Sequence, residues 1–555
     1  MKASRRGLVA ALVILLVAIG GTTAWVVGGG RGASAGPPPR FVDETSASGL
    51  AHVYEGDFDY VAGGGVAAFD CNADGRADLY IAGGQGPAEL FRNDSAVGGS
   101  LRFTPLPGPV TDLAEVNGAY PIDVDGDGNT DLAVLRNGGN RLLRGLGDCR
   151  FEDATAAWGL DPGTRHTEAF SATWEVGSGW PTLAFGNYVD PVVYGDATTL
   201  DPGKWCEPNE LVRPASGGHG FGVPLSLTPS WCTLSLLFSD WSGSGSMDLR
   251  VSNDRHYYGT VGSEQLWRIA PGAAPRLYTA ADGWATVQVE GMGIASQDLT
   301  GDGRPEIYLT SQAANRLQTL AAGASGPSYE EVGAKYGVSA AQPFTGGEDL
   351  PSTAWHPQFD DVNNDGLLDL LVTKGNVQAQ PDFAQKDPTN LLLGQPDGTF
   401  REAADVAGIL TFDRARGAAL ADFNLDGRLD LVVVNYGAPV RLWRNGGPDP
   451  AAGDASNASW LALRITQPGP NLDAIGGVVE VRSAGQVVRR ELTIGGGHVG
   501  GQLGWVHFGL GTATSAEVRV TWPDRQATDW QPVEANRFYV LRRGEAPDAW
   551  PGAAE

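Results

Sequence analysis

The sequence lacks the short motifs that mark many enzymes. Its seven histidines are scattered without HExxH spacing, and no P-loop, Rossmann fingerprint or GxSxG elbow stands in a convincing context. Positive charge is also scarce, because 39 Lys and Arg face 65 Asp and Glu in the 555 residues, for a net charge of −26. Phosphate binding needs clustered basic residues, so this balance disfavours nucleic acid as a partner.

Cysteine is scarce as well, with four residues in the chain: Cys71, Cys149, Cys206 and Cys232. No CxxC pair or nearby histidine cluster exists, which disfavours a zinc site. Four cysteines allow three disulfide pairings, and we favour Cys206–Cys232 with Cys71–Cys149. Disulfides persist in oxidising compartments, so this pattern fits an exported protein.

A long apolar run occurs near the N-terminus, where Lys2, Arg5 and Arg6 precede the residues from Leu8 to Gly20. A basic segment before such a run predicts an export signal. Read through to Val27, the run has about 20 residues and reaches across a bilayer as an uncleaved anchor. Residues 1–35 are therefore predicted to be a signal peptide or a single N-terminal membrane anchor. Either alternative places the rest of the protein in the periplasm or outside the cell, and the anchored form is held in the inner or cytoplasmic membrane.

What the chain has in abundance is an acidic nine-residue loop, which recurs five times. The copies are DCNADGRAD, DVDGDGNTD, DLTGDGRPE, DVNNDGLLD and DFNLDGRLD. Side chains that carry oxygen stand at positions 1, 3, 5 and 9, with glycine at position 6. Ca²⁺ takes six to eight oxygen ligands, and a tight loop supplies them from alternate residues. We therefore expect about five Ca²⁺ sites, with position 7 contributing a backbone carbonyl. The predicted ligands are Asp70, Asn72, Asp74, Arg76 and Asp78; Asp123, Asp125, Asp127, Asn129 and Asp131; Asp298, Thr300, Asp302, Arg304 and Glu306; Asp361, Asn363, Asp365, Leu367 and Asp369; and Asp422, Asn424, Asp426, Arg428 and Asp430.

The residues after each loop exclude an EF-hand. An EF-hand needs a glutamate at position 12 and flanking helices. Here position 12 is apolar, and each loop runs into a short segment rich in β-branched residues, which predicts a strand. These position-12 residues are Ile81, Val134, Leu309, Val372 and Val433.

The loops belong to a larger repeat. An aromatic residue, polar residues and a Gly-Leu-like ending recur at 41–50, 151–160, 329–338 and 400–409. Two degenerate units, near Trp174 and Asp240, fill the long gap between the second and third loops. Periods of 40–60 residues with strands and turns are typical of propellers. We predict an all-β protein with a seven-bladed β-propeller over 36–450, with six or eight blades as alternatives, and an insertion at 191–232. Alternating strands over 455–545 predict a small β-sandwich-like domain.

The repeat unit GVAAFDCNADGRADLYIAGG resembles the FG-GAP and VCBS repeats of integrin-α-like propellers. The segments NLDAIGGVVEV, WVHFGLG and VRVTWPD resemble the ASPIC and UnbV type of C-terminal domain found in the cartilage acidic protein family. The resemblance covers roughly 41–545. The two degenerate units depart from the family pattern, so neither is assigned a metal.

Two hypotheses for function follow. The first is a non-catalytic, calcium-rigidified scaffold, monomeric, that presents propeller loops to a protein or glycan ligand, with the insertion at 191–232 as the expected binding region. The second is a propeller enzyme, a polysaccharide lyase or an oxidoreductase, with a site in the central funnel. Its candidate residues are His219, the segment from Arg255 to Tyr258, and Trp355 with His356. Asn471 and His507 are expected to be structural.

Overall fold

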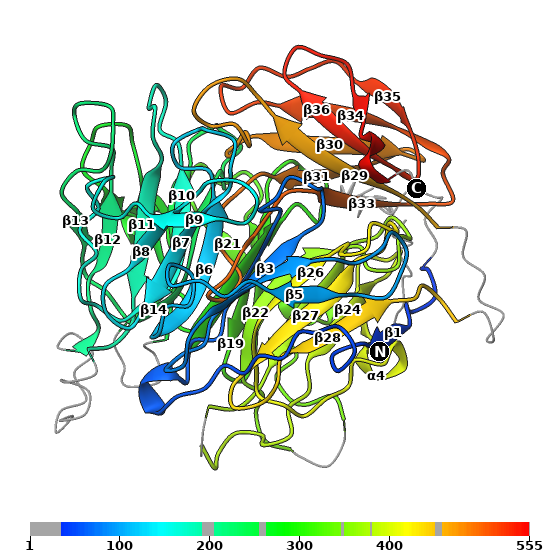
Figure 1. The fold of residues 1–555 in the computed structure, drawn as a ribbon, viewed down its shortest axis with the longest axis horizontal. Coiled ribbons are helices and arrows are strands. Elements are labelled where there is room, and N and C mark those ends of the chain that lie inside the picture. Colours follow the sequence, from blue (N-terminus) through cyan, green and yellow to red (C-terminus); the bar gives the residue numbers. More distant parts are fainter. Residues whose placement is uncertain are drawn as a thin grey trace, which may run out of the picture.

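The computed structural model describes residues 35–190, 205–254, 262–345, 349–377, 380–449 and 458–553 (Figure 1). The predicted signal or anchor at 1–35 lies almost entirely outside these residues, as do 191–204 of the predicted insertion and the segment 450–457. Among the described residues, no helix has the length and apolar content needed to cross a membrane.

The segments that follow the acidic loops are strands, as predicted, and the described chain before residue 450 forms seven sheets. The first two sheets contain β2 (Val66–Phe69), β3 (Asp78–Ile81), β4 (Glu89–Asn93) and β5 (Phe103–Pro105), and β6 (Val116–Ile122), β7 (Asp131–Arg136), β8 (Arg141–Gly145) and β9 (Phe151–Asp153). The next two contain β10 (Thr167–Thr173), β11 (Thr182–Asn187), β12 (Asn209–Val212) and β13 (Leu225–Leu227), and β14 (Thr233–Ser239), β15 (Asp248–Asn253), β16 (Gln265–Arg268) and β17 (Arg276–Leu277).

The remaining three sheets continue the same antiparallel order. They contain β18 (Gly291–Gln297), β19 (Glu306–Ser311), β20 (Arg316–Leu320) and β21 (Tyr329–Glu331); β22 (Ala354–Asp360), β23 (Asp369–Lys374), β24 (Asn390–Gly394) and β25 (Phe400–Glu402); and β26 (Ala415–Ala421), β27 (Asp430–Asn435), β28 (Arg441–Asn445) and β1 (Phe41–Asp43). Within the described ranges the helices with given bounds are short: η1 (Phe58–Tyr60), η3 (Ala280–Asp282), α3 (Gly333–Tyr336), α4 (Ala404–Ala407) and η5 (Pro551–Ala553).

The sheets form a closed ring. The first strand of each sheet contacts the first strand of the next, and β26 contacts β2 to complete the circle. The N-terminal strand β1 pairs with β28 and so supplies the outer strand of the last sheet. Joining the first and last strands of the ring in one sheet leaves few exposed strand edges, which stabilises a closed β architecture. The repeated aromatic segments at 41, 151, 329 and 400 are outer strands of their sheets.

The structure corrects the predicted insertion at 191–232. Strand β12 pairs with β11, and β13 pairs with β12. Residues 209–227 therefore hold the two outer strands of the third sheet. The sequence signal was weak because the segments NELV and LSL are short and partly polar, and the acidic loop that marks other units is missing here.

The C-terminal residues form two further sheets that share one hydrophobic core, which includes Leu463, Val479, Phe508 and Val518. This two-layer packing agrees with the predicted sandwich, and the all-β fold class is confirmed. In Figure 1 these orange and red strands lie against one side of the ring. One sheet contains β33 (Val506–Gly511), β29 (Ser459–Thr466), β36 (Arg537–Arg542) and β37 (Asp548–Ala549), and the other contains β31 (Gln486–Glu491), β30 (Val478–Ser483), β34 (Ser515–Thr521) and β35 (Gln531–Glu534).

One segment of the C-terminal domain leaves the sandwich and enters the ring. After β31, residues 494–503 (IGGGHVGGQL) form isolated bridges to β6, β10, β14 and β18, and β32 (Gln502–Leu503) pairs in parallel with β2. Glycines at the start of the first strands make room for it, since Gly65 and Gly118 both lie against the Val499 carbonyl. We call residues 494–503 the axial segment, because it contacts the inner strands of five sheets.

Candidate metal centres

The five acidic loops share one backbone conformation. Each loop joins the first strand of a sheet to the second, and positions 4 and 6 are both left-handed. Glycine at position 6 tolerates this conformation at no steric cost. Position 4 is also left-handed where it is not glycine, and at Ala73 and Leu425 the residue type gave no sign of this. The φ values at position 4 are Ala73 61°, Gly126 72°, Gly301 73°, Asn364 60° and Leu425 56°, and those at position 6 are Gly75 84°, Gly128 87°, Gly303 86°, Gly366 87° and Gly427 83°.

The carboxylate at position 1 holds the turn closed. One of its oxygens accepts the backbone N–H of position 6 in every loop, for example Gly366 to Asp361 Oδ2 at 2.7 Å. The corresponding donors are Gly75, Gly128, Gly303 and Gly427. Likewise, the carboxylate at position 5 accepts the N–H of position 7, as Asp365 Oδ1 does from Leu367 at 2.8 Å. The same bond joins Arg76 to Asp74, Asn129 to Asp127, Arg304 to Asp302, and Arg428 to Asp426.

The carboxylate at position 9 joins its loop to the third strand of the sheet. Asp369 Oδ2 accepts the N–H of Val362 at 2.9 Å, while Oδ1 accepts the N–H of Gly394 at 2.8 Å. Asp78, Asp131 and Asp430 repeat this pair of bonds. In the third loop Glu306 accepts from the N–H of Leu299 and from the Thr319 hydroxyl. Position 9 is therefore a structural anchor whatever else it binds.

The predicted carboxylates come closest together in the second loop. In the second loop, oxygens of Asp123, Asp125 and Asp131 lie within 4.8 Å of one another. In the fourth loop, Asp361, Asp365 and Asp369 are all buried, and no ion pair to them occurs within the described residues. Three buried carboxylates without a basic partner are costly unless a cation binds them. The donor set is all oxygen, which fits a hard divalent cation such as Ca²⁺.

An unpaired amide oxygen in the fifth loop gives independent support for the fit. Asn424, at position 3, is fully buried, and its Nδ2 donates to the Gly99 carbonyl at 2.8 Å. This bond turns the other end of the amide away from Gly99, and Oδ1 accepts no hydrogen bond within the described chain. Buried polar oxygens rarely lack a partner. A cation held by Asp422 and Asp426 would supply one.

The electrostatics agree with this geometry. Burial raises the pKa of Asp123 to about 7, and burial together with the neighbouring Asp426 raises the pKa of Asp422 to about 8. Burial likewise raises the pKa of Asp78 and of Glu306 to about 7. The pKa values of Asp361 and Asp369 also lie well above the usual range, through burial first and the nearby Asp365 second. Without a cation, these groups resist ionisation at neutral pH.

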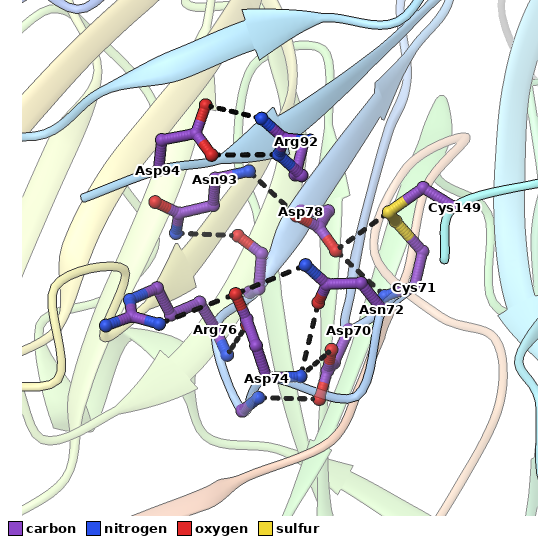
Figure 2. The surroundings of a disulfide bond; sticks show 12 residues. Asp70, Cys71, Asn72, Asp74, Arg76, Asp78, Arg92, Asn93, Asp94 and Cys149 are labelled. Atoms are coloured by element: carbon purple, nitrogen blue, oxygen red, sulfur yellow. Dashed lines mark hydrogen bonds and ion pairs between the residues drawn. A yellow bond between two sulfur atoms is a disulfide. The ribbon is translucent and has the colours of Figure 1, made fainter. Parts of the chain in front are cut away.

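The first loop carries a disulfide. Cys71, at position 2, is bonded to Cys149, which comes just before β9 of the second sheet (Figure 2). Cys71 also donates its N–H to Asp78, so the disulfide ties this loop directly to the neighbouring unit. Cys206 and Cys232 form the second disulfide, and both predicted pairings are confirmed.

The two degenerate units lack this arrangement. In the Trp174 unit, Glu175 is the acidic residue after the first strand, and it pairs with Arg213. In the Asp240 unit, positions 3 and 5 are both serine, so the aspartate that all five loops carry at position 5 is missing. Asp248, at position 9, accepts bonds from the Trp241 indole and the Tyr278 hydroxyl, both at 2.8 Å. Neither unit offers three convergent carboxylates.

Sequence reasoning missed what covers the loops. Position 6 of each acidic loop lies against the C-terminal domain, and the Trp550 ring fills the space that a β-carbon on Gly75 would need. Trp505 Nε1 also donates to the Gly75 carbonyl at 2.9 Å. The other contacts are Gly128 with Leu472, Gly303 with Arg489, Gly366 with Gly511, and Gly427 with Trp460. The C-terminal domain therefore rests on the acidic-loop face of the ring.

The residues suggested for a funnel enzyme do not form a cluster in the described chain. His219 lies in an exposed turn, whereas Trp355 and His356 are buried beside the axial segment, where His356 Nδ1 accepts the N–H of His498 at 3.1 Å. The segment from Arg255 to Tyr258 lies outside the described residues.

Asn471 and His507 have structural contacts. Asn471 closes a turn through two bonds with the backbone of Ile475. His507 is buried on β33 and its Nε2 lies 2.6 Å from Asn364 Oδ1, at position 4 of the fourth loop. His507 thus joins the two domains.

Comparison with known families defines the class of protein. A family described as FG-GAP-like repeat matches residues 70–134 and 361–433, which contain four of the five loops. A family described as ASPIC and UnbV matches residues 467–548. The chain is thus a β-propeller protein with FG-GAP-like repeats and a C-terminal ASPIC and UnbV domain, as the sequence resemblance predicted.

Part of the chain is similar to cartilage acidic protein 1. It is 29% identical to the human protein over 164 residues, which cover 28% of this chain and 22% of that protein. It is 40% identical to the Xenopus tropicalis protein over 60 residues, covering 11% of this chain and 9% of that one. The match to these relatives thus spans about a fifth of their length or less.

Solved structures show weaker similarity. A lectin from Agrocybe aegerita, described as recognising non-reducing terminal N-acetylglucosamine, has a TM-score of 0.38 and 16% identity, covering 68% of this chain and 93% of that one. A hypothetical selenium-binding protein from Sulfolobus tokodaii has a TM-score of 0.41 and 11% identity, covering 70% and 84%.

Proposed function

We propose that the protein is an exported, calcium-binding propeller that acts as a non-catalytic scaffold for a protein or glycan ligand. The observation that carries this proposal is the repetition of one geometry in five loops, each with carboxylates gathered at one end of a sheet. Ca²⁺ in these loops neutralises the convergent charge and fixes each turn, so that its binding energy stabilises the fold.

Two features support export. Both disulfides join segments that are buried, and disulfides of this kind persist in the periplasm or outside the cell. The apolar N-terminal run after Lys2, Arg5 and Arg6 acts as the export signal or as the membrane anchor.

The arrangement of the domains supports a ligand surface away from the acidic loops. The C-terminal domain covers the loop face, and the axial segment occupies the centre of the ring. The opposite face and the outer rim remain for a partner, including the surface near the Cys206–Cys232 disulfide. A protein or a glycan suits this site, whereas the net charge of −26 opposes nucleic acid. We propose that the scaffold acts as a monomer.

The test combines metal analysis with thermal melting of the purified protein in Ca²⁺ and in EGTA. We expect four to six bound Ca²⁺ per chain. Each site at a free Ca²⁺ concentration 100-fold above its Kd adds about 2.7 kcal/mol to stability, so chelation lowers the melting temperature by on the order of 10 °C or more. Asp361→Asn should reduce the count by one, while the exposed Asp405→Asn should not. No bound Ca²⁺ and no shift with EGTA would refute the calcium role.

A further inference from the structure

The Asp240 loop keeps the shape of a metal loop although its sequence has degenerated. Gly243 and Gly245, at positions 4 and 6, are left-handed with φ of 70° and 87°. Asp240 accepts the N–H of Ser244 at 2.9 Å and that of Gly245 at 2.5 Å. These bonds match those of Asp361 with Asp365 and Gly366. The loop is therefore folded like the other five.

The oxygen ligands, however, are mostly lost or engaged. Ser242 and Ser244 are bonded to each other at 2.8 Å, and Ser242 also donates to Asp240. Asp248 is held by the Trp241 indole, the Tyr278 hydroxyl and the N–H of Ile269. One carboxylate, that of Asp240, remains at the centre of the loop, and it is largely buried.

A guanidinium from the C-terminal domain meets this carboxylate. Arg525 Nη1 lies 3.4 Å from Asp240 Oδ2, and Nη2 donates to the Gly243 carbonyl at 2.7 Å. The Arg525 side chain also occupies the space that a β-carbon on Gly245 would need. In the first loop the comparable ion pair is longer, since Arg464 Nη1 lies 3.8 Å from Asp70 Oδ2. Arg525 thus contacts positions 1, 4 and 6 of a single loop.

A tight turn with a left-handed residue places Arg525 at the loop. Arg525 follows the Trp-Pro-Asp motif in the turn after β34, its N–H donates to the Trp522 carbonyl at 2.8 Å, and its φ is 71°. A non-glycine residue rarely adopts that conformation unless its surroundings fix it. The same domain contacts the loop at a second point, where Glu491 accepts hydrogen bonds from the Asp240 N–H and the Ser239 hydroxyl, both at 2.7 Å.

We propose that Arg525 replaces the cation in the Asp240 loop and makes it a calcium-independent latch for the C-terminal domain. The guanidinium supplies the positive charge that a metal would bring, and it tethers the two domains at the same time. The other five loops meet the C-terminal domain through varied contacts, among them Arg464 beside Asp70 and Arg489 beside Gly303. Because their buried carboxylates need a cation, we expect their shape, and with it the docking surface, to depend on bound Ca²⁺. This comparison of the loops rests on the proposed calcium role, but the latch itself does not.

The test is hydrogen–deuterium exchange of the full-length protein, read at residues 494–503 and 515–528. Arg525→Gln removes the charge but keeps the length of the side chain. In EGTA the latch acts together with the Arg490–Asp360 ion pair, which joins the same two domains at 2.7 Å, and we expect Arg525→Gln to raise exchange in both segments about tenfold over wild type. In Ca²⁺ the increase should be smaller, because the five loaded loops still hold the domain. Arg525→Lys, which keeps the charge, should fall between wild type and Arg525→Gln.

A double-mutant cycle with Asp240→Asn identifies the partner. If Arg525 acts through Asp240, the double variant exchanges no faster than Arg525→Gln alone. Arg537→Gln, an exposed arginine paired with Glu534 elsewhere in the same domain, is the matched control and should leave exchange at 494–503 unchanged. Equal exchange for Arg525→Gln and wild type in EGTA would overturn the latch. Equal exchange of the wild-type protein in EGTA and in Ca²⁺ would instead contradict the calcium role alone.

Discussion

The Asp361 loop and the Asp240 loop have the same backbone but balance their charge in different ways. In the first, three carboxylates are buried, burial together with Asp365 raises the pKa of the other two, and no basic side chain of the described chain pairs with them. In the second, Ser244 stands in place of Asp365, and Arg525 faces the carboxylate of Asp240 at the centre. The bonds from positions 5 and 6 to the first aspartate are common to both. The turn is therefore specified by its backbone bonds and glycine, while the source of positive charge is specified separately.

The largest effect in this comparison should come from position 9 of the Asp361 loop. Asp369→Ala leaves the buried N–H groups of Val362 and Gly394 without acceptors. Each buried N–H left unpaired costs about 1–3 kcal/mol, so we expect a loss of about 2–6 kcal/mol even in EGTA. Denaturant unfolding in EGTA measures it. A loss seen only in Ca²⁺ would mean that Asp369 acts as a ligand and not as an anchor.

The pH dependence of stability should show which acidic loops need a bound cation, in contrast to the Asp240 loop, where Arg525 supplies the positive charge. In EGTA, Asp78, Asp123 and Asp422 have folded pKa values of about 7 to 8, above the ordinary aspartate value of 3.8. The folded state then holds more protons, so stability falls as pH rises through about 7 and 8. Buried His356 and His498 act in the opposite sense, but only below the ordinary histidine pKa of 6.5.

The informative window is therefore pH 6.5 to 8, measured by thermal melting. We expect the melting temperature in EGTA to fall by several degrees across it, and the fall to be smaller in Ca²⁺, which holds these carboxylates ionised. Asp422→Asn should reduce the slope in EGTA. Equal slopes with and without Ca²⁺ would contradict the cation role.

Exchanging the residues at position 5 between the two loops should weaken Ca²⁺ binding in the Asp361 loop without creating a Ca²⁺ site in the Asp240 loop. Asp365→Ser gives the Asp361 loop the residue found at Ser244, and we expect at least a tenfold loss of affinity at that site, or about 1.4 kcal/mol. Calorimetric titration with Ca²⁺ measures it. The reciprocal Ser244→Asp should add no site, because Arg525 and the engaged Asp248 remain. A new site in that variant would show that Arg525 does not compete with a metal.

The smallest effect should come from position 4, where the loops differ in residue but share the left-handed backbone. Ala73 is exposed, with φ of 61°, so Ala73→Gly should raise stability by about 1 kcal/mol or less. Gly301→Ala, at the same position of the third loop, should lower it by a similar amount. Unfolding curves for the pair test the assignment, and shifts of the same sign would contradict it.

Much of the fold was predictable from local patterns. Carboxylates at fixed spacing, glycine at position 6 and an apolar position 12 identify each loop and the strand after it, because both depend on neighbours within a dozen residues. The two disulfides form one of the three pairings that four cysteines allow, and it is the pairing that was favoured from the sequence. The outer strands β12 and β13 were mistaken for an insertion, since short and partly polar segments carry little periodic signal.

The sequence by itself determined the repeated loops, the strands and the class of protein, since these depend on short-range backbone geometry and side-chain alternation. Only the tertiary structure decided what surrounds them. In the sequence, the glycines of the axial segment are typical of a flexible loop. In the structure, Gly495 and Gly500 are needed because inner strands from different sheets leave no room for side chains there. The Arg525 contact likewise joins residues 285 positions apart. No local pattern encodes such contacts, because they arise only after seven sheets close into a ring and a second domain packs upon it.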